Sequence, residues 1–417
     1  DPNTNPNPNT NPNPSTNPNP NTSNIHNLET LLADEPRDTM PEAKVASSDL
    51  ATIFYTSGST GHPKGALSSH LNILSALMSW ELDVQASALV TGIPVPELPH
   101  QTATLLGVPL FHVAGSHAVM LMCYRLQRKM VSMYRWNVEE AMRLIETEKI
   151  SSFVAPAAMT GDLVNAASDS PAYDLSALLT VGGGGAPRAP EQVKNIASAF
   201  ANALPSTGWG MTETNAIGTG IAGHDYVAHS GSSGRSSAVL DLRVVDDQGK
   251  ALPPNTRGEL QVRGASVIQG YWNRPEANAE TFDGDWLRTG DVAYLDEEGY
   301  LYIVDRIKDL VIRGGENIGC AEVEAGLLEH PQVLEASVYA VPDERLGEEV
   351  GAAIYCDGKL DKDELLAFLA GVMARFKIPR YINFADDPLP RIASGKIDKR
   401  ALREAFVASL APPAHHK

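Results

Sequence analysis

Apolar and polar residues follow two different spacings along the chain, and these separate extended from helical segments. Asp49–Thr56 (DLATIFYT) is rich in β-branched and aromatic residues and leads into a loop of glycine, serine and threonine. Leu71–Leu82 then carries apolar residues at helical spacing. We therefore expect a strand, a small-residue loop and a helix in that order, an arrangement that places backbone N–H groups around a phosphate.

The same kind of alternation continues to about residue 230. Further short strands are expected at Ser152–Ala155, Ala177–Val181 and Pro205–Trp209, with helical stretches such as Val138–Lys149 and Pro190–Ala203 between strands. Strands that alternate with helices are typical of an α/β domain with an at least partly parallel sheet.

The pattern changes at about Gly231. Short alternating strands at Val239–Val245, Gly258–Arg263 and Tyr300–Val304 are separated by glycine, proline and aspartate turns, which indicates a small β-rich subdomain. Beyond Asp305 the pattern mixes hairpins with amphipathic helices. The predicted fold is α/β: a large multi-layer α/β domain with a small β-rich subdomain (24–304), followed by a small α+β C-terminal domain (305–417).

Residues 1–23 contain only aspartate, proline, asparagine, threonine and serine. A segment without apolar side chains cannot offset the entropy lost on ordering its backbone, and its Asn-Pro steps favour turns or extended conformers. A native tail, an engineered linker and a peptide joined from elsewhere all fit this low-complexity segment. We assign it no function.

The formal net charge of -18 argues against a general affinity for nucleic acid or for an anionic membrane. No run of about 18 apolar residues is present, so we expect no integral membrane segment. The three cysteines, Cys123, Cys320 and Cys356, are far apart and form no CxxC pair, which favours reduced thiols in a cytoplasmic protein over a zinc site.

The strongest chemical signal is Thr56–Gly65 (TSGSTGHPKG). Small residues let the backbone approach an anion closely, and Lys64 adds a positive charge. A Walker A loop is excluded because that motif needs serine or threonine after the lysine, where this chain has Gly65.

This segment resembles the phosphate loop of the adenylate-forming superfamily, which includes acyl-CoA synthetases, peptide-synthetase adenylation domains and luciferases. The resemblance implies that ATP or AMP is bound there by Thr56, Ser57, Gly58, Ser59, Thr60, Gly61 and Lys64.

Three later motifs follow in the order that the family has them. Pro109–Gly115 (PLFHVAG) is similar to its acyl-pocket motif and implies that His112 lies beside the substrate carboxylate. Gly182–Pro187 (GGGGAP) resembles the turn that borders the adenine, with Gly185, Ala186 and Pro187 as contacts. In Gly208–Glu213 (GWGMTE), the resemblance implies that Trp209 stacks on adenine in place of the commoner tyrosine, beside Gly210, that Thr212 contacts phosphate and that Glu213 binds Mg²⁺.

Further motifs complete the series. Trp286–Asp291 (WLRTGD) resembles the ribose-binding motif and assigns Asp291 to the ribose hydroxyls, with Arg306 as a second ribose or phosphate contact. Asp305–Asp309 (DRIKD) resembles the family's hinge, with Lys308 at the pivot. The residues that would line the pantetheine tunnel for CoA are Gly314, Gly315, Glu316 and Asn317. Pro390–Ile397 (PRIASGKI) is similar to the motif of the catalytic lysine, here Lys396.

Taken singly, His112, Asp291, Arg306 and Lys396 would be ordinary core or surface residues, and their place in the series supports the assignment. The resemblance implies that ATP, with Mg²⁺, converts a carboxylic acid to its acyl-AMP and that the acyl group passes to CoA, with Lys396, Glu213 and His112 as catalytic groups. We expect a medium- or long-chain fatty acid, and an aryl acid next, because Gly182–Gly185 and Asn215–Gly218 are small enough to line a deep tunnel. The pair Gly319-Cys320, which follows the CoA loop, departs from the family pattern, and we expect it to widen the mouth of the tunnel.

The resemblance extends over Ser48–Ala408, but relatives carry a long segment before the phosphate loop, where this chain has residues 24–48. We therefore expect a chain that lacks the beginning of its large domain, with open sheet edges that a second copy could cover. One alternative is a nucleotide-binding fragment without turnover. An amino-acid adenylation domain is less favoured because Phe111–Gly115 has no carboxylate to pair with a substrate ammonium group, and nothing specific indicates a luciferase. A nucleic-acid-binding or structural protein fits poorly.

Overall fold

The computed structural model describes residues 42–56, 63–92, 94, 98–169, 173–184, 190–392 and 395–410. The residues from Ala46 onward belong to one compact unit. All helices and strands named below belong to this unit.

A mostly parallel sheet forms the centre of the large domain. Within the described residues it has the strand order β4-β3-β5-β6-β7-β8-β9, in which β4 to β7 run parallel and β8 and β9 antiparallel. The strands are β3 (Ala103–Leu106), β4 (Lys129–Ser132), β5 (Ser152–Val154), β6 (Thr180–Gly184), β7 (Leu204–Gly208), β8 (Thr219–Ala222) and β9 (Arg235–Ser236). The prediction of an α/β domain is confirmed.

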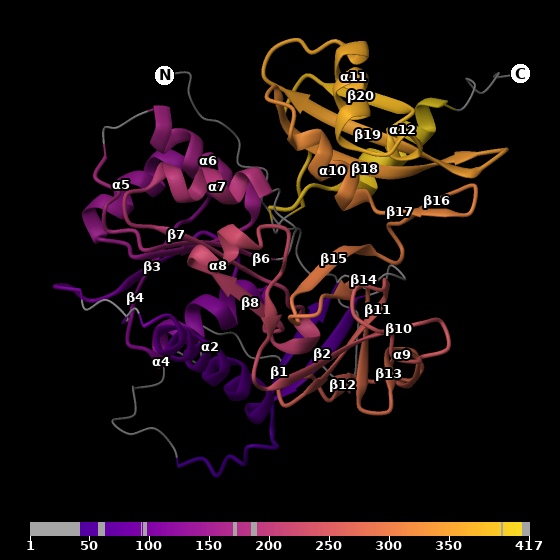
Figure 1. Cartoon of the computed structure of the whole chain (residues 1–417). Helices are drawn as coiled ribbons and strands as arrows, with labels where there is room; N and C mark the ends of the chain where they lie inside the picture. The colour runs from indigo at the N-terminus through magenta and orange to yellow at the C-terminus, as the bar shows by residue number, and fades with distance from the viewer. Residues whose placement is uncertain are drawn as a thin grey trace, which may run out of the picture. The chain divides into compact units, whose positions relative to one another are not determined.

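Helices lie on both faces of this sheet. Figure 1 shows α5 (Val138–Glu148), α6 (Ala157–Asp169) and α7 (Pro190–Ala199) together on one side, and α2 (His70–Thr91) with α4 (Met122–Arg125) on the other. The core between α5–α7 and the sheet contains fully buried side chains from both layers, among them Leu105, Phe153, Val181, Ile145 and Leu163. Three shorter helical segments are α3 (Val113–Gly115), the π-helix η2 (Ser116–Leu121) and α8 (Gly223–Ala228).

The segment around the phosphate loop differs from the strand–loop–helix prediction. The loop joins two antiparallel strands, β1 (Leu50–Thr56) and β2 (Lys64–Ser69), whose ends pair at Thr56 and Lys64. The short strand β12 (Gly270–Tyr271) adds to the other edge of β2. Helix α2 begins only after β2, where the Ser69 side chain accepts a hydrogen bond from the Asn72 amide and caps the helix.

Helix α2 is the one described helix that is long and apolar enough to cross a membrane by length and composition. Its buried residues include Ile73, Ala76 and Leu77, and Glu81 forms an ion pair with Arg125 of α4. The sequence predicts a helix here, at Leu71–Leu82, but no membrane-spanning segment, because it contains no run of about 18 apolar residues.

An antiparallel sheet forms the β-rich subdomain. Its strands are β10 (Leu240–Val245), β11 (Gly258–Gly264), β13 (Phe282–Asp283), β14 (Trp286–Leu295) and β15 (Leu301–Arg306), with α9 (Pro275–Thr281) between β12 and β13. Leu260, Val262 and Leu287 are fully buried beneath it. The strands β10, β11 and β15 correspond to the three that the sequence predicts after Gly231.

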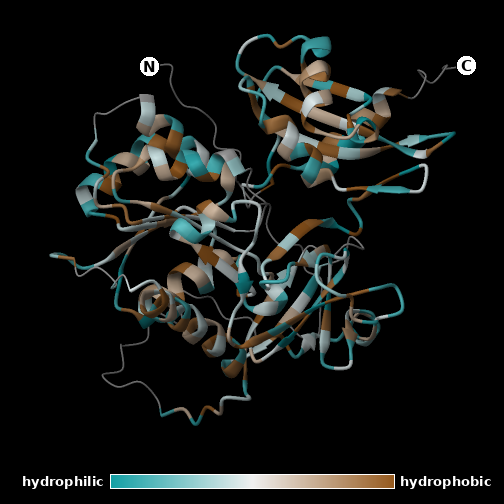
Figure 2. Cartoon of the chain, in the orientation of Figure 1, coloured by the Kyte–Doolittle hydropathy of each residue, from teal (hydrophilic) through white to brown (hydrophobic). Residues whose placement is uncertain are grey.

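The C-terminal α+β domain has its own sheet and core. Its elements are β16 (Val311–Arg313), β17 (Glu316–Ile318), α10 (Cys320–Leu328), β18 (Val333–Asp343), β19 (Gly347–Cys356), α11 (Lys362–Val372), the 3-10 turn η4 (Arg375–Lys377), β20 (Tyr381–Ala385) and α12 (Lys399–Leu410). The middle of β18 and β19 is hydrophobic in Figure 2, and Val338 and Ile354 there pack with Leu365 and Leu369 of α11.

Candidate active site

Asp291 is the centre of the first part of the site. It lies on β14, is 2% exposed, and is directly opposite Arg306 of β15. Arg306 Nε lies 2.6 Å from Asp291 Oδ1, and the indole Nε1–H of Trp209 donates to Asp291 Oδ2 at 2.8 Å. Burial raises the pKa of the Asp291 carboxyl, and the charge of Arg306 and the Trp209 hydrogen bond act against that rise. Three residues from separate segments therefore meet at one carboxylate.

Trp209 is held by close packing in the loop that follows β7. A Cβ atom on Gly218 would lie 2.4 Å from the Trp209 ring, so the ring occupies the space above that glycine. A Cβ on Gly182 would likewise lie 2.5 Å from Ser206 Oγ. At these two positions the small residues make room for neighbouring protein atoms and not for a substrate tunnel.

Glu213 is the centre of the second part of the site. It lies in the 3-10 turn η3 (Thr212–Thr214) and is 7% exposed. The phenol of Tyr271 donates to Glu213 Oε1 at 2.7 Å, and Lys64 Nζ lies 4.2 Å from the centre of the Tyr271 ring. Thr212 belongs to the same turn, and a Cβ on Gly210 would lie 2.2 Å from the Ala216 carbonyl oxygen.

None of the sequence motifs selects Tyr271. The available signal is the aromatic pair Tyr271-Trp272, which follows the apolar pair Val267-Ile268 after Gln269 and Gly270. That signal indicates a packed aromatic residue but does not indicate a bond to a carboxylate 58 residues earlier in the chain.

Lys396 connects the C-terminal domain to this site. It lies in a turn after Gly395, in which the Ile392 amide donates to the Lys396 carbonyl. Burial lowers the pKa of Lys396 and nearby Arg306 lowers it further, while Asp291 raises it. The pKa of His112 is lowered by burial and then by the charge of Lys396. These mutual effects place the Lys396 charge within electrostatic reach of Arg306, Asp291 and His112, and a Cβ on the preceding Gly395 would lie 3.9 Å from the Met159 side chain of the large domain.

The predicted hinge is a turn between β15 and β16 in which Lys308 is exposed. Asp305, at the end of β15, accepts hydrogen bonds from the backbone amides of Cys320 and Ala321, the first residues of α10. Cys320 is fully buried, and its thiol donates to the Asp309 carbonyl at 2.9 Å. The expectation that Gly319-Cys320 widens a tunnel mouth is therefore wrong, because the cysteine is enclosed at the start of α10.

The predicted CoA loop is a hairpin. Gly314 and Gly315 have positive φ angles of 60° and 91° and form the turn between β16 and β17, and Glu316 and Asn317 are exposed on β17. The left-handed conformation explains why glycine stands at both turn positions.

Part of the predicted nucleotide site falls outside the described residues: Ser57, Gly58, Ser59, Thr60, Gly61, Gly185, Ala186 and Pro187. Thr56, the last residue of β1, is described, and its hydroxyl donates to the Lys64 carbonyl at 3.5 Å. The phosphate-loop and adenine-turn assignments stay predictions.

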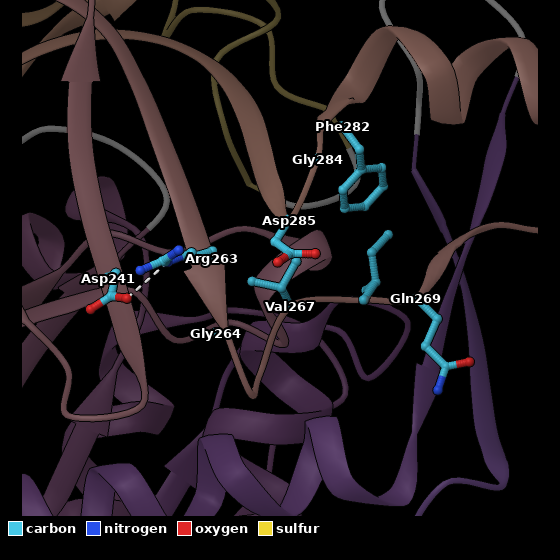
Figure 3. A pocket seen from close by; sticks show the side chains of 9 residues that line it. Asp241, Arg263, Gly264, Val267, Gln269, Phe282, Gly284 and Asp285 are labelled. Atoms are coloured by element: carbon cyan, nitrogen blue, oxygen red, sulfur yellow. Dashed lines mark hydrogen bonds and ion pairs between the residues drawn. The ribbon is translucent and has the colours of Figure 1, made fainter. Parts of the chain in front are cut away.

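A hollow of about 610 Å³ lies on the β-rich subdomain, lined by residues that include Asp241, Arg263, Val267 and Phe282. Figure 3 shows the exposed Arg263–Asp241 ion pair, with Nε and Oδ2 2.9 Å apart, at one side of it. The hollow contains none of the predicted site residues, so we assign it no part in the site.

Comparison with known protein families gives two matches. The family described as AMP-binding enzyme matches residues 5–272, and the AMP-binding enzyme C-terminal domain matches residues 322–396.

Curated relatives include long-chain-fatty-acid–CoA ligase FadD13 of Mycobacterium tuberculosis, which is 33% identical over 92% of this chain and 72% of its own length. Feruloyl-CoA synthase of an Amycolatopsis species is 36% identical over 89% of this chain and 73% of its own.

Solved structures show the same architecture. o-Succinylbenzoate CoA synthetase (MenE) of Bacillus subtilis, in complex with its acyl-adenylate intermediate, has a TM-score of 0.76 and 30% identity, and the match covers 90% of this chain and 73% of that one. ATP-bound MatB of Rhodopseudomonas palustris has a TM-score of 0.79 and 28% identity over 92% of this chain and 73% of its own. The chain therefore belongs to the AMP-binding enzyme family, and within it to the acyl-CoA synthetases of the adenylate-forming superfamily.

Proposed function

We propose that this chain uses ATP to activate a carboxylic acid as its acyl-AMP and then transfers the acyl group to the thiol of CoA. The observation that carries the proposal is that Lys396 lies within electrostatic reach of Asp291 on β14, Arg306 on β15 and His112. Two cations and a neutral imidazole beside a ribose-binding carboxylate suit a reaction that joins two anions, a carboxylate and a phosphate.

In the first step, a carboxylate oxygen of the acid attacks the α-phosphorus of ATP. A C(=O)–O–P bond forms, the bond from the α-phosphorus to the bridging oxygen breaks, and pyrophosphate leaves with the electron pair. Lys396 and Lys64 stabilise the negative charge that develops on the phosphate oxygens. The lowered pKa of His112 keeps its imidazole neutral at pH 7, so it contacts the substrate carboxylate as a hydrogen-bonding group.

The described residues fit ATP and its metal ion. A carboxylate has about four lone-pair sites, so Asp291 can accept two ribose hydroxyls while it bonds to Trp209 and Arg306. Glu213 offers a buried carboxylate oriented by Tyr271, and Mg²⁺ commonly binds one carboxylate together with substrate phosphates. When bound, the ion would supply positive charge to the phosphate oxygens.

In the second step, the CoA thiolate attacks the acyl carbonyl carbon, the thioester bond forms and AMP leaves. We propose that the C-terminal domain first rotates about Lys308, which withdraws Lys396 and brings the Gly314–Gly315 hairpin to the site. The exposed position of Lys308, in a turn between two sheets, supports this pivot.

We propose a medium- or long-chain fatty acid as the substrate, and an aryl acid as the second candidate. The identity to FadD13 supports the first, and the similarity to feruloyl-CoA synthase supports the second. The expected glycine-lined tunnel does not support either choice of substrate at Gly182 and Gly218, because neighbouring side chains fill the space above both glycines.

The test is acid-dependent AMP release from ATP, Mg²⁺ and CoA, with a panel of acids from acetate to palmitate together with benzoate and ferulate. Release that requires both CoA and one class of acid supports the ligase and names its substrate. ATP binding without release for any acid would instead support a nucleotide-binding fragment. Pyrophosphate exchange that depends on amino acids would support an adenylation domain.

A further inference from the structure

Tyr271 lies between two groups that the proposed reaction uses separately. Its hydroxyl donates to the Glu213 carboxylate at 2.7 Å, while Lys64 Nζ lies 4.2 Å from its ring centre. The side chain is 4% exposed, so solvent does not compete strongly for either contact. One aromatic residue therefore contacts both the predicted metal carboxylate and the predicted phosphate lysine.

The backbone around Tyr271 is fixed on two sides. Strand β12 pairs with β2, the strand that begins at Lys64, through the Tyr271–Ala66 register. On the other side, the Tyr271 amide donates to Asn278 Oδ1 at 2.7 Å. The ring is thus held by the same strand that carries the lysine, and its distance from Lys64 does not depend on a loop.

The Tyr271 hydroxyl donates its hydrogen bond to Oε1 of the Glu213 carboxylate at 2.7 Å. A hydrogen bond from a fixed donor to a carboxylate restricts the carboxylate's rotation, and bonds to charged groups are among the stronger ones in proteins.

We propose that Tyr271 is a positioning residue that sets the Glu213 carboxylate and the Lys64 ammonium group for joint binding of Mg²⁺ and the ATP phosphates. The inference rests on the proposed function, and it deepens it by coupling metal binding to phosphate binding through one side chain.

The test measures ATP binding by isothermal titration calorimetry, with Mg²⁺ and with EDTA. Tyr271→Phe removes the hydroxyl and keeps the ring under Lys64. Loss of one hydrogen bond to a charged group is expected to weaken ATP binding in Mg²⁺ by about tenfold or more. In EDTA, the variant should bind ATP within about twofold of the parent, because the contact between Lys64 and the ring remains.

The chain contains a matched control. Tyr300 donates to Asp225 Oδ1 at 2.7 Å, carries the Arg235 guanidinium 4.2 Å from its ring centre, and is 3% exposed, and these partners are not among the predicted site residues. Tyr300→Phe should leave ATP affinity unchanged in both conditions. It removes the same kind of bond, to a carboxylate that is more exposed than that of Glu213.

A double-variant cycle shows whether the effect passes through Glu213. In a Glu213→Gln background, Tyr271→Phe should cause little further loss, because the carboxylate it orients is gone. Equal weakening of ATP binding by Tyr271→Phe in Mg²⁺ and in EDTA, or an unchanged affinity in both, would overturn the coupling while the parent's Mg²⁺-dependent ATP binding still stands. A parent chain that binds no ATP with Mg²⁺ would overturn both the coupling and the proposed function.

Discussion

Two charges of opposite sign act on Lys396: the Arg306 guanidinium lowers its pKa and the Asp291 carboxylate raises it. We expect Lys396→Ala to slow acyl-AMP formation by about 10²–10³-fold, the typical effect of removing one preorganised charge-stabilising group. Thioester formation from supplied acyl-AMP should change much less, because we propose that Lys396 has withdrawn by that step. Single-turnover measurement of each half-reaction checks this.

The control for that variant is Lys359→Ala, which removes an exposed lysine of the same domain and should leave both rates unchanged. If Lys396→Ala slows the two half-reactions equally, the proposal that Lys396 acts only in acyl-AMP formation is wrong.

His117, in the π-helix η2, predicts a pH dependence of stability. Burial lowers its pKa to about 4, and its side chain is 1% exposed. Since an unfolded histidine titrates near 6.5, the unfolded chain binds more protons between pH 4 and 6.5, and the folded state loses stability as pH falls through that window. His117→Gln should reduce the stability lost between pH 7 and pH 5 by about 2 kcal/mol, from RT times the logarithm of the ratio of the two proton-binding polynomials.

Urea unfolding at both pH values measures this difference. His224→Gln, at an exposed histidine, should follow the parent's pH dependence. If the free energy of unfolding of His117→Gln changes with pH as it does in the parent, the pKa of His117 is not lowered in the folded state.

At the scale of elements, the packing of Trp209 on Gly218 links the loop after β7 to the start of β8. A methyl group at Gly218 would lie within 2.4 Å of the ring, so we expect Gly218→Ala to destabilise the fold by about 1–3 kcal/mol, as overpacking does. It should also weaken ATP binding, because the displaced indole can no longer hold Asp291. Urea unfolding and calorimetry measure the two effects.

Gly220→Ala provides the comparison, because no atom lies within 4 Å of a Cβ at that position, which belongs to β8, two residues after Gly218. Equal stability of the two alanine variants would show that the Trp209 loop moves aside at no cost.

Elements with a clear hydrophobic periodicity could be predicted from the sequence, but elements that form because they pair with a neighbouring strand could not. The strands β5 and β7 and the helix α5 agree with their predicted positions to within a few residues. Strand β2 (KGALSS) was missed because glycine and serine give it no strand preference of its own; its pairing with β1 and β12 specifies it.

The same distinction holds in the candidate site. Motif order selected Trp209, Asp291, Arg306 and Lys396, which the fold brings together. The Trp209–Asp291 bond spans 82 residues, and no local pattern contains it. Tyr271 was missed for the same reason.

At the scale of the whole molecule, Asp305 bonds across the proposed pivot. Its carboxylate belongs to β15, before Lys308, and the amides it accepts from belong to α10, after Lys308. Rotation at Lys308 would separate these groups. We expect Asp305→Asn, which keeps the shape and removes the charge, to weaken the cap by about 1 kcal/mol and to shift the balance several-fold toward the rotated state.

The ratio of the two half-reaction rates measures that shift: acyl-AMP formation should become slower relative to thioester formation. Asp309→Asn is the matched control, because the Asp309 contact to α10 is made by its backbone carbonyl, which the substitution keeps. A parallel fall of both rates in Asp305→Asn would mean that the carboxylate serves only to stabilise α10.

The cap on α10 also has a consequence for timing. A bond that exists in one orientation and not in the other adds to the barrier for leaving that orientation, so it lengthens the dwell time of the adenylating state. A longer dwell gives the acid and ATP more time to react before the domain turns, but it also delays the arrival of the thiol. The Asp305 carboxylate would then set how long the C-terminal domain stays in the adenylating orientation. The strength of its hydrogen bonds to α10 would affect the rate of turnover more than the stability of the fold.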